Sequence, residues 1–391
     1  MEQSQHPPLN RPPSLLRLFT SFLRLGATAF GGPAMVAYIQ SMAVEKKHWL
    51  DDQSARDGVA LCQTIPGATA MQMSAYVGLR ARGVAGAGAS FIGFGLPAFL
   101  FMMILSALYA RTHTLPAVVS AFNGLQAIVV AVVANATLSF GRNSIKNWKN
   151  VINALIAAGL FALKVNPILV IIVAAFLGMI LYDKQPLFPP VGGMQKTHAP
   201  KSLLLILLVT AIGFTAFYFL DRKLFDLATL MFRIDLFAFG GGFASVPLMY
   251  HEVVEARSWL DGPTLLNGIV LGQVTPGPIV ITATFIGFLL KGPLGGLIAT
   301  ISIFLPSFMI VVATAPYFDR LRSLPYFKKV ITGILCSFVG LLLTVTVRFA
   351  LNIPWDITRI LLSGAAFIAL LLKVDILWVV LVGTVISLIA L

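Results

Sequence analysis

The chain has 391 residues, of which 58% are hydrophobic and 11% are charged, and its formal net charge is +13. Because soluble proteins carry about 25% charged residues, this composition excludes an ordinary soluble domain and indicates a polytopic membrane protein. The basic residues are scattered over short loops, so the charge does not indicate nucleic-acid binding; it fits the bias of Lys and Arg toward cytoplasmic loops, and it would also attract an anionic substrate.

In chain order, the sequence divides into four parts. Residues 1–17 are polar and proline-rich, and we expect a cytosolic tail without a cleavable signal peptide. Residues 18–182 form an N-terminal transmembrane repeat with predicted spans 18–40, 58–79, 84–110, 117–140, 150–164 and 167–182. Residues 183–224 are a polar loop and a linking helix, 203–220. Residues 225–391 form a C-terminal repeat with predicted spans 225–250, 267–289, 294–315, 329–350, 357–371 and 374–391, about 13 spans in all.

The second block of spans is a copy of the first. Ala29-Phe30-Gly31-Gly32 recurs 209 residues later as Ala238-Phe239-Gly240-Gly241, and an ordered set of matches from Glu45 to Gly67 recurs 210 residues later. Shared composition does not explain so ordered a match, so the chain is an internal duplication. Six spans per repeat and one linking helix predict an all-α fold with inverted repeats. If 150–182 and 357–391 are each one broken helix, the inversion is lost.

Glycine and proline interrupt two predicted spans in each repeat. Inverted repeats with broken helices are typical of secondary transporters, in which the amino termini of half-helices bind an anion near mid-membrane. The first break exposes backbone amides, and the second places Gln and Thr side chains beside a proline. The predicted substrate-binding residues are therefore Gly31, Gly32, Gln63, Thr64, Pro66, Gly67, Gly240, Gly241, Gly242, Gln273, Thr275, Pro276 and Gly277.

Charged residues beside the breaks are further candidates. Arg24 and Arg233 match each other and would be cationic partners for an anion, although Arg24 could equally extend to the cytosolic interface. Asp235 would either pair with Arg233 or carry a proton. Glu45 and Glu255 lie in loops where we favour a structural role, with gating or proton coupling as the alternative.

The ordered motifs resemble those of the chromate ion transporter (CHR) family in its long, two-domain form. They are Phe30-Gly31-Gly32-Pro33, Glu45…Trp49, Gln63…Pro66-Gly67 and Leu96-Pro97, with their second copies Phe239-Gly240-Gly241-Gly242, Glu255…Trp259, Gln273…Pro276-Gly277-Pro278 and Leu305-Pro306-Ser307. The resemblance implies an inner-membrane carrier that exports chromate, confers resistance and uses the membrane gradient. No Walker A pattern is present. Ala68 against Pro278, and Pro33 against Gly242, predict an asymmetric site.

Other readings stay open on the sequence. A carrier of another tetrahedral oxyanion such as sulfate would need the same donors, and a channel is also compatible with inverted repeats. An intramembrane enzyme is a remote alternative, because no catalytic set of residues lies at depth. We expect no cofactor and no metal, and a homodimer is compatible with the sequence. Placing the amino terminus in the cytoplasm puts most Lys and Arg in inner loops and the carboxyl terminus in the periplasm.

Overall fold

The computed structural model describes residues 12–30, 34–182, 200–318, 324 and 326–391, and these form helices without a β-sheet. The predicted tail lies largely outside the described residues, as does most of the polar loop. Helix begins at Leu15, within the predicted tail. The all-α fold predicted from the sequence is confirmed.

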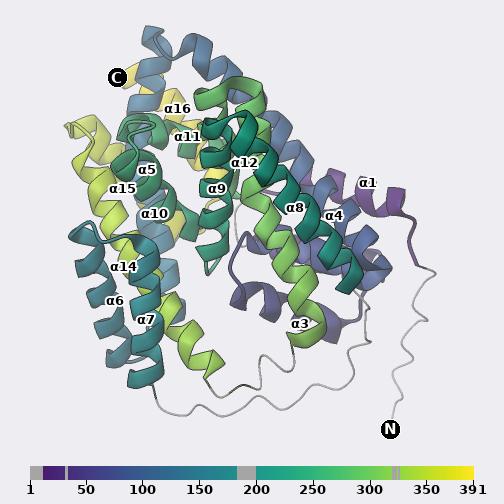
Figure 1. The fold of residues 1–391 in the computed structure, drawn as a ribbon. Helices are drawn as coiled ribbons and strands as arrows, with labels where there is room; N and C mark the ends of the chain where they lie inside the picture. The colour runs from purple at the N-terminus through teal and green to yellow at the C-terminus, as the bar shows by residue number, and fades with distance from the viewer. Residues whose placement is uncertain (1–11, 31–33, 183–199, 319–323, 325) are drawn as a thin grey trace.

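The described helices of the first repeat and its copy follow the same order (Figure 1). Repeat 1 contains α1 (Leu15–Thr28), α2 (Ala34–Ser41), the π-helix η1 (Met42–Lys46), α3 (Asp52–Thr64), α4 (Thr69–Thr112), α5 (Pro116–Ser144), α6 (Trp148–Ala162) and α7 (Pro167–Leu181). The linking helix is α8 (Pro200–Leu220). Repeat 2 contains α9 (Arg222–Phe237), η2 (Gly242–Ala244), α10 (Ser245–Met249), η3 (Tyr250–Ala256), α11 (Gly262–Val274), η4 (Ile279–Ile281), α12 (Thr282–Thr314), η5 (Ala315–Tyr317), α14 (Phe327–Leu351), α15 (Ile357–Leu371) and α16 (Ile376–Ala390).

The backbone reproduces the duplication in detail, including at a position where the side chains differ. His48 and Ser258, 210 residues apart, share a φ of 51°, and Lys164 and Lys373, 209 apart, share a φ of 63°. Two helix caps also recur: Asp51 Oδ1 accepts from Ser54 N at 2.8 Å, and Asp261 Oδ1 accepts from Thr264 N at 2.7 Å. Each cap satisfies an amide that the first helical turn leaves without a partner.

The broken spans double back on themselves instead of continuing across the bundle. In repeat 1, Tyr76 Oη of α4 donates to Ser54 O of α3 at 3.1 Å, whereas a continuous helix would separate these residues by about 33 Å. In repeat 2, Arg233 Nη2 of α9 donates to Glu252 of η3 at 2.6 Å. The predicted spans 58–79 and 225–250 are therefore helical hairpins with interior tips, which residue periodicity alone did not reveal.

In each repeat, the kink of the long helix lies beside the start of the first helix. Arg82, at a kink in α4, donates to Pro13 O before α1 at 2.9 Å. The equivalent kink in α12 places Lys291 Nζ 2.7 Å from Asp221, directly before α9. Each repeat thus brings the start of its first helix back to the kink of its long helix.

Equivalent long helices of the two repeats pack antiparallel. Along α5 and α14, Ser144 O accepts from Cys336 Sγ, while seven residues earlier Thr137 Oγ1 lies 3.3 Å from Thr346 Oγ1. Helices α4 and α12 also contact each other along their length. Because equivalent helices of the two repeats run in opposite directions, a two-fold axis that relates them is perpendicular to the helices.

The short apolar helices are exchanged between the repeats. Helices α6 and α7 pack on α14 of repeat 2, and α15 and α16 pack on α5 of repeat 1 (Figure 1). The contacts are close: Gly178 of α7 and Gly333 of α14 touch through their backbones, and Gly124 N of α5 donates to Ser387 Oγ of α16 at 3.1 Å. Each repeat therefore depends on the short helices of the other repeat to cover its own long helix, α5 or α14.

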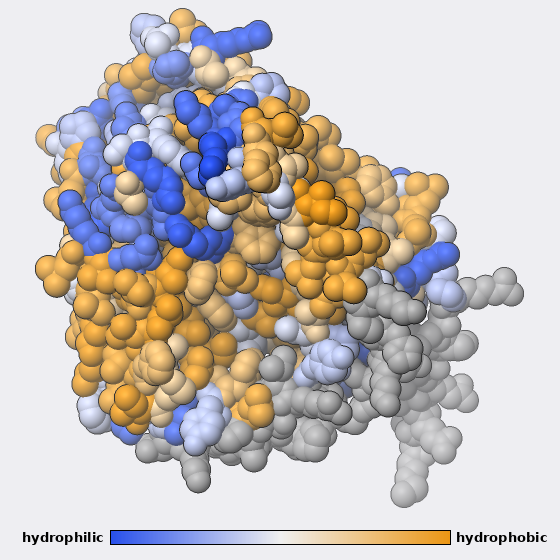
Figure 2. All heavy atoms as spheres, viewed as in Figure 1, coloured by the Kyte–Doolittle hydropathy of each residue, from blue (hydrophilic) through white to orange (hydrophobic). Residues whose placement is uncertain are grey.

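The surface fits a lipid environment. Figure 2 shows hydrophobic side chains over most of the visible face, with hydrophilic side chains gathered in the region of α10 and α11. Five described helices are long and apolar enough to cross a membrane, and α6, α7, α15 and α16 are shorter apolar helices. The protein is a multi-pass membrane protein; the exact number of spans stays a prediction.

Candidate anion-binding site

The hairpin tips of the two repeats bind each other crosswise at the centre of the molecule. Gly67 N of repeat 1 donates to Ala238 O of repeat 2 at 2.9 Å, and Gly277 N of repeat 2 donates to Ala29 O of repeat 1 at 3.0 Å. Pro66 and Phe239 form an isolated antiparallel bridge. The four breaks in the predicted spans therefore meet at one place, where each repeat supplies backbone hydrogen-bond partners to the other.

Glycine is required at these tips by backbone geometry. The φ angles are +121° at Gly67, +94° at Gly240, +98° at Gly241 and +112° at Gly277. Residues with a Cβ rarely adopt this region. A Cβ on Gly67 would also collide with the Ser307 hydroxyl. Gly31 and Gly32 lie outside the described residues.

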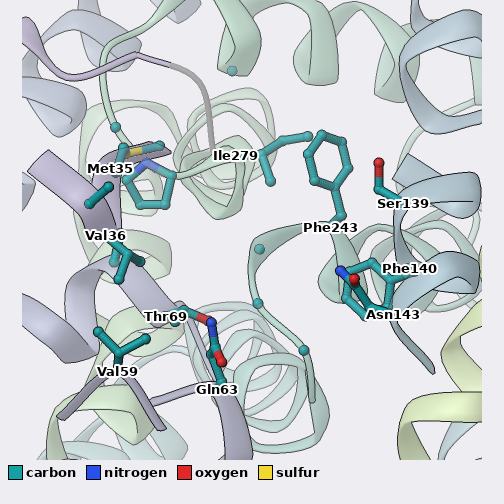
Figure 3. A pocket seen from close by; sticks show the side chains of 18 of the residues that line it. Met35, Val36, Val59, Gln63, Thr69, Ser139, Phe140, Asn143, Phe243 and Ile279 are labelled. Atoms are coloured by element: carbon teal, nitrogen blue, oxygen red, sulfur yellow. The ribbon is translucent and has the colours of Figure 1, made fainter. Parts of the chain in front are cut away.

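A cavity of about 650 Å³ lies beside the paired tips. In Figure 3, Val59, Gln63 and Thr69 face it from repeat 1, Phe140 and Asn143 face it from α5, and the empty space lies between them. Its polar wall residues are Gln40, Gln63, Thr69, Ser139, Asn143, Ser144, Gln273 and Thr275, and the glycines Gly240, Gly241, Gly242, Gly272 and Gly277 complete the side next to the tips.

The cavity wall offers donors without fixed charge. Among the described residues that line it there is no Asp, Glu, Lys, Arg or His. Gln273 Nε2 is buried and has no partner in the described part of the chain. Helix α4 begins at the wall with Thr69 and Ala70, and the methyl side chain of its cap residue Ala68 makes no hydrogen bond to the first amides. Such amides carry partial positive charge and suit an anion.

The structure brings together about half of the predicted binding residues. Gln63, Gly240, Gly241, Gly242, Gln273, Thr275 and Gly277 line the cavity. Thr64, Pro66, Gly67 and Pro276 are not in the wall: Thr64 Oγ1 donates to Ala60 O at 2.6 Å, and the others shape the tips. Their part in substrate binding stays a prediction.

The charged candidates lie outside the wall and have other neighbours. Arg24 is exposed, and Arg233 bonds to Glu252. Asp235 does not form the pairing with Arg233 that the sequence left open; it is fully buried and bonds to Ser307. Glu45 is exposed and accepts from Ser41 Oγ at 2.6 Å. No group of three His, Cys, Asp or Glu among the described residues could hold a metal ion.

Sequence reasoning missed the part of the wall that α5 supplies. Ser139, Phe140 and Asn143 lie at or just beyond the end of a predicted span, and the glycine among them, Gly141, does not break helix α5. A usable signal existed, because Phe140 and Asn143 recur 209 residues later as Phe349 and Asn352. A conserved spacing within the duplication would have marked this end of α5.

The equivalent positions in the two repeats are open in one and packed in the other. We call Gln40, Ser139, Phe140 and Asn143 the open side, because all four line the cavity, with Ser139 and Asn143 exposed. Their equivalents Tyr250, Arg348, Phe349 and Asn352 form the closed side. Since α5 and α14 are antiparallel, the open and closed sides lie toward opposite ends of the molecule.

Contacts between η3 and α14 seal the closed side. Phe349 is fully buried with its ring 5.3 Å from that of Tyr250, and Asn352 Nδ2 donates to Tyr250 Oη at 3.2 Å. Arg348 Nη1 bonds to Glu255 Oε1 at 2.5 Å, and its Nη2 donates to Phe161 O at 2.6 Å. On the open side, Ser139 stands where Arg348 would be and cannot form the same ion pair.

The surroundings of Glu255 on the closed side favour the ionised form of its carboxylate. Burial acts to raise the pKa of Glu255, but the hydrogen bond from His251 and the charge of Arg348 outweigh it and hold that pKa below its usual value. A depressed pKa means that the ionised carboxylate is more stable in the folded state than in the unfolded state. The ion pair thus stabilises closure most fully at neutral pH.

Comparison with known proteins assigns the family. The chain matches the family described as chromate transporter over residues 16–179 and 225–388. It is 45% identical to an uncharacterized transporter of Methanocaldococcus jannaschii, covering 96% of this chain and 94% of the relative. It is 30% identical to the chromate transport protein of Cupriavidus metallidurans (92% and 88% covered) and 29% identical to a probable chromate transport protein of Synechococcus elongatus (91% and 90%). No solved structure matches the chain. The chain therefore belongs to the chromate transporter family, with one copy of the family's characteristic region in each repeat.

Proposed function

We propose that the protein is a secondary carrier that exports chromate from the cytoplasm across the inner (plasma) membrane of its cell and so confers chromate resistance. The observation that carries this proposal is the uncharged cavity at the crossed hairpin tips, where helix amino termini and the unpartnered Gln273 amide meet. Amide donors of this kind can hold a tetrahedral dianion without fixed charges that would trap it. The names of the relatives supply the choice of chromate.

A carrier is supported over a channel by the difference between the two sides. A channel needs a path that is continuous from end to end, whereas here one side is open and its equivalent is packed by Phe349 and the Arg348–Glu255 pair. Inverted repeats can exchange these two arrangements. Transport then follows from repeat 1 adopting the packed arrangement while repeat 2 adopts the open one.

The proposed topology keeps the amino terminus in the cytoplasm and the carboxyl terminus outside, with the repeats inverted. The antiparallel packing of equivalent helices supports the inversion. The hairpins move the loop at 46–56 to the end where Pro13 and Arg82 lie, since Arg80 donates to Ser54 at 3.2 Å. Lys46, Lys47 and Arg56 thereby join the inner side, which strengthens the positive-inside bias. The open side then faces the cytoplasm, ready to load substrate.

Energetics allow export without a second substrate. A dianion leaving a cell that is negative inside gains about 4.6 kcal/mol per 100 mV, from about 2.3 per charge. Sulfate is the second candidate substrate, because the wall of Gln63, Gln273, Thr69 and backbone amides would bind any tetrahedral oxyanion of this charge. A homodimer stays a prediction, and no described cluster favours an intramembrane enzyme.

The test is uptake of labelled chromate by inside-out membrane vesicles under an imposed potential. Saturable uptake that Gln273→Leu weakens, with a matched Gln53→Leu variant on the exposed face of α3 as control, would support the proposal. Excess sulfate added to the same vesicles measures selectivity. Uptake of sulfate but not chromate would overturn the substrate and keep the mechanism, and uptake of neither would overturn the carrier.

A further inference from the structure

A buried carboxylate, Asp235, lies near the crossed tips and belongs neither to the cavity wall nor to the closed side. Asp235 of α9 has no exposed surface. Its Oδ2 accepts from Ser307 N at 2.8 Å and from Ser307 Oγ at 2.7 Å. Its Oδ1 is buried without a hydrogen-bond partner in the described part of the chain. The residue thus has one oxygen held by two donors and one oxygen held by none.

Ser307 connects this carboxylate to the cavity wall. Its Oγ donates to Asp235 and accepts from Ala68 N at 2.8 Å. Ala68 caps α4, and the next residue, Thr69, lines the cavity. Asp235 also lies three residues before Ala238, whose carbonyl holds the tip at Gly67. The carboxylate therefore ties α9, α12 and the tip of repeat 1 together.

Among the residues that the structure describes, no cation is bonded to this carboxylate. The charged groups on α9 and on neighbouring helices have other surroundings: Arg233 bonds to Glu252, Lys291 to Asp221, Arg80 to Ser54 and Arg82 to Pro13, Arg222 lies over the Tyr218 ring, and Lys223 is exposed. Asp226 is exposed, and α10 carries no ionisable residue. A buried carboxylate without a cation is costly when ionised and becomes neutral by binding a proton.

The arrangement joins α9 and α12 of repeat 2 to the tip of repeat 1, and it has no counterpart at the symmetry-equivalent place. The positions equivalent to Asp235, Ser307 and Ala68 are Gly26, Ala98 and Pro278, which lack the carboxylate, the hydroxyl and the N–H respectively. A Cβ on Gly26 would collide with the Phe94 carbonyl, so no side chain fits there. All three partners are present at one of the two equivalent junctions between the repeats and absent at the other, although the tips themselves recur. Packing of the tips therefore does not require the carboxylate.

We propose that Asp235 is a proton-binding site, with Oδ1 as the atom that holds the proton, and that its occupancy is coupled to the movement of the anion. The proton comes from water on one side of the membrane and leaves to water on the other, so no bond other than O–H forms or breaks. Ionisation of Asp235 strengthens its hold on Ser307, and protonation weakens it. Ala68 N, at the tip of repeat 1, donates to the same Ser307 hydroxyl. Binding or release of the proton at Asp235 therefore changes how firmly this part of the cavity wall is held.

This inference rests on the proposed carrier function, and one assay separates the two. Purified protein in liposomes that contain a pH-sensitive dye is given chromate at alkaline pH, where the substrate is a dianion. Chromate exchange at equal concentrations on both sides reports the carrier alone. Proton movement that accompanies net chromate flux reports the coupling. If the wild type does not exchange chromate, the proposed function fails; if it exchanges chromate but moves no protons, the coupling fails.

Asp235→Asn keeps the shape of the residue and fixes it without charge. We expect it to keep exchange and to lose the proton movement, whereas the control Asp226→Asn, an exposed change on the same helix, keeps both. Ser307→Ala, which removes the connecting hydroxyl, should also lose proton movement. Should Asp235→Asn not fold, Ser307→Ala decides alone. Retained proton movement in either variant would show that Asp235 is only a structural carboxylate and overturn the proposal.

Discussion

The open side and the closed side descend from the same sequence and differ in a few side chains. Phe140 and Phe349, and Asn143 and Asn352, are identical pairs, yet the first of each pair faces the cavity and the second belongs to the packed side. The substitutions that accompany this difference are Arg348 for Ser139 and Tyr250 for Gln40. The comparison teaches that the shared residues permit both arrangements, while the ion pair and the tyrosine decide which repeat is closed.

The largest effect should come from Arg348→Ser, which gives repeat 2 the residue of the open side. It leaves Glu255 largely buried without its cation, a loss of about 3 kcal/mol. We expect the closed side to open. A maleimide that cannot cross the membrane should then label a cysteine placed at Asn352, against a low background because Cys62 and Cys336 are buried. Arg359→Ser, at an ion pair with an exposed aspartate, is the control. Unchanged labelling would show that the ion pair does not hold the closure.

The two glutamines test the asymmetry of the cavity. Gln273 has a buried amide without a partner, whereas Gln63 is exposed. Gln273→Leu should weaken chromate binding about tenfold, or 1.4 kcal/mol, because it removes a desolvated donor to the anion. Gln63→Leu should change it less, since water can replace an exposed donor. Equal losses in a binding titration would mean that the two repeats contribute equally.

Acidification should weaken the ion pair that holds the closed side. The pKa of Glu255 is depressed, so its stabilisation is present above the usual carboxylate pKa and is lost as pH falls through the depressed value. Because maleimide reacts with the thiolate, labelling at Asn352→Cys is divided at each pH by the labelling of an exposed cysteine. This ratio should rise at acidic pH by less than Arg348→Ser causes, and Glu255→Gln should abolish the rise. A rise that persists in Glu255→Gln would place the titrating group elsewhere.

The smallest effect is expected where the repeats agree. Asp51 and Asp261 cap equivalent helices through bonds of 2.8 and 2.7 Å. Asp51→Ala and Asp261→Ala should each lower stability by about 1 kcal/mol, read as similar drops in the thermal unfolding midpoint. Asp52→Ala, which removes an exposed neighbour that caps nothing, is the control. Clearly unequal drops would show that the two hairpins differ even in their outer parts.

Much of this architecture could be predicted because glycine and proline leave local signals. The breaks at Gly67, Gly240, Gly241 and Gly277 follow from backbone conformations that glycine favours, and the duplication marks them twice. The hairpins could not be predicted in the same way. A broken helix that continues and one that doubles back have the same local sequence, and the Tyr76–Ser54 contact that distinguishes them is long-range.

The site was predicted unevenly for the same reason. Gln63 and Gln273 stand beside the breaks and were found, whereas Ser139 and Asn143 come from a regular helix and were not. Arg233 looked like a ligand for an anion because its counter-ion, Glu252, is distant in sequence and has no charged equivalent in repeat 1. Whether these two charges pair depends on whether the broken helix doubles back, and sequence spacing does not report that.

The exchange of short helices has a consequence for how the protein is made. Helix α5 leaves the ribosome early, but its partners α15 and α16 are synthesised only at the end of the chain. At about 5–20 residues per second, the groove on α5 stays uncovered for on the order of ten seconds or more. During that interval the newborn first half is a substrate for insertases and quality control, and truncation anywhere before α15 leaves it without a completed partner surface. The last thirty or so residues thus complete the packing of the first half.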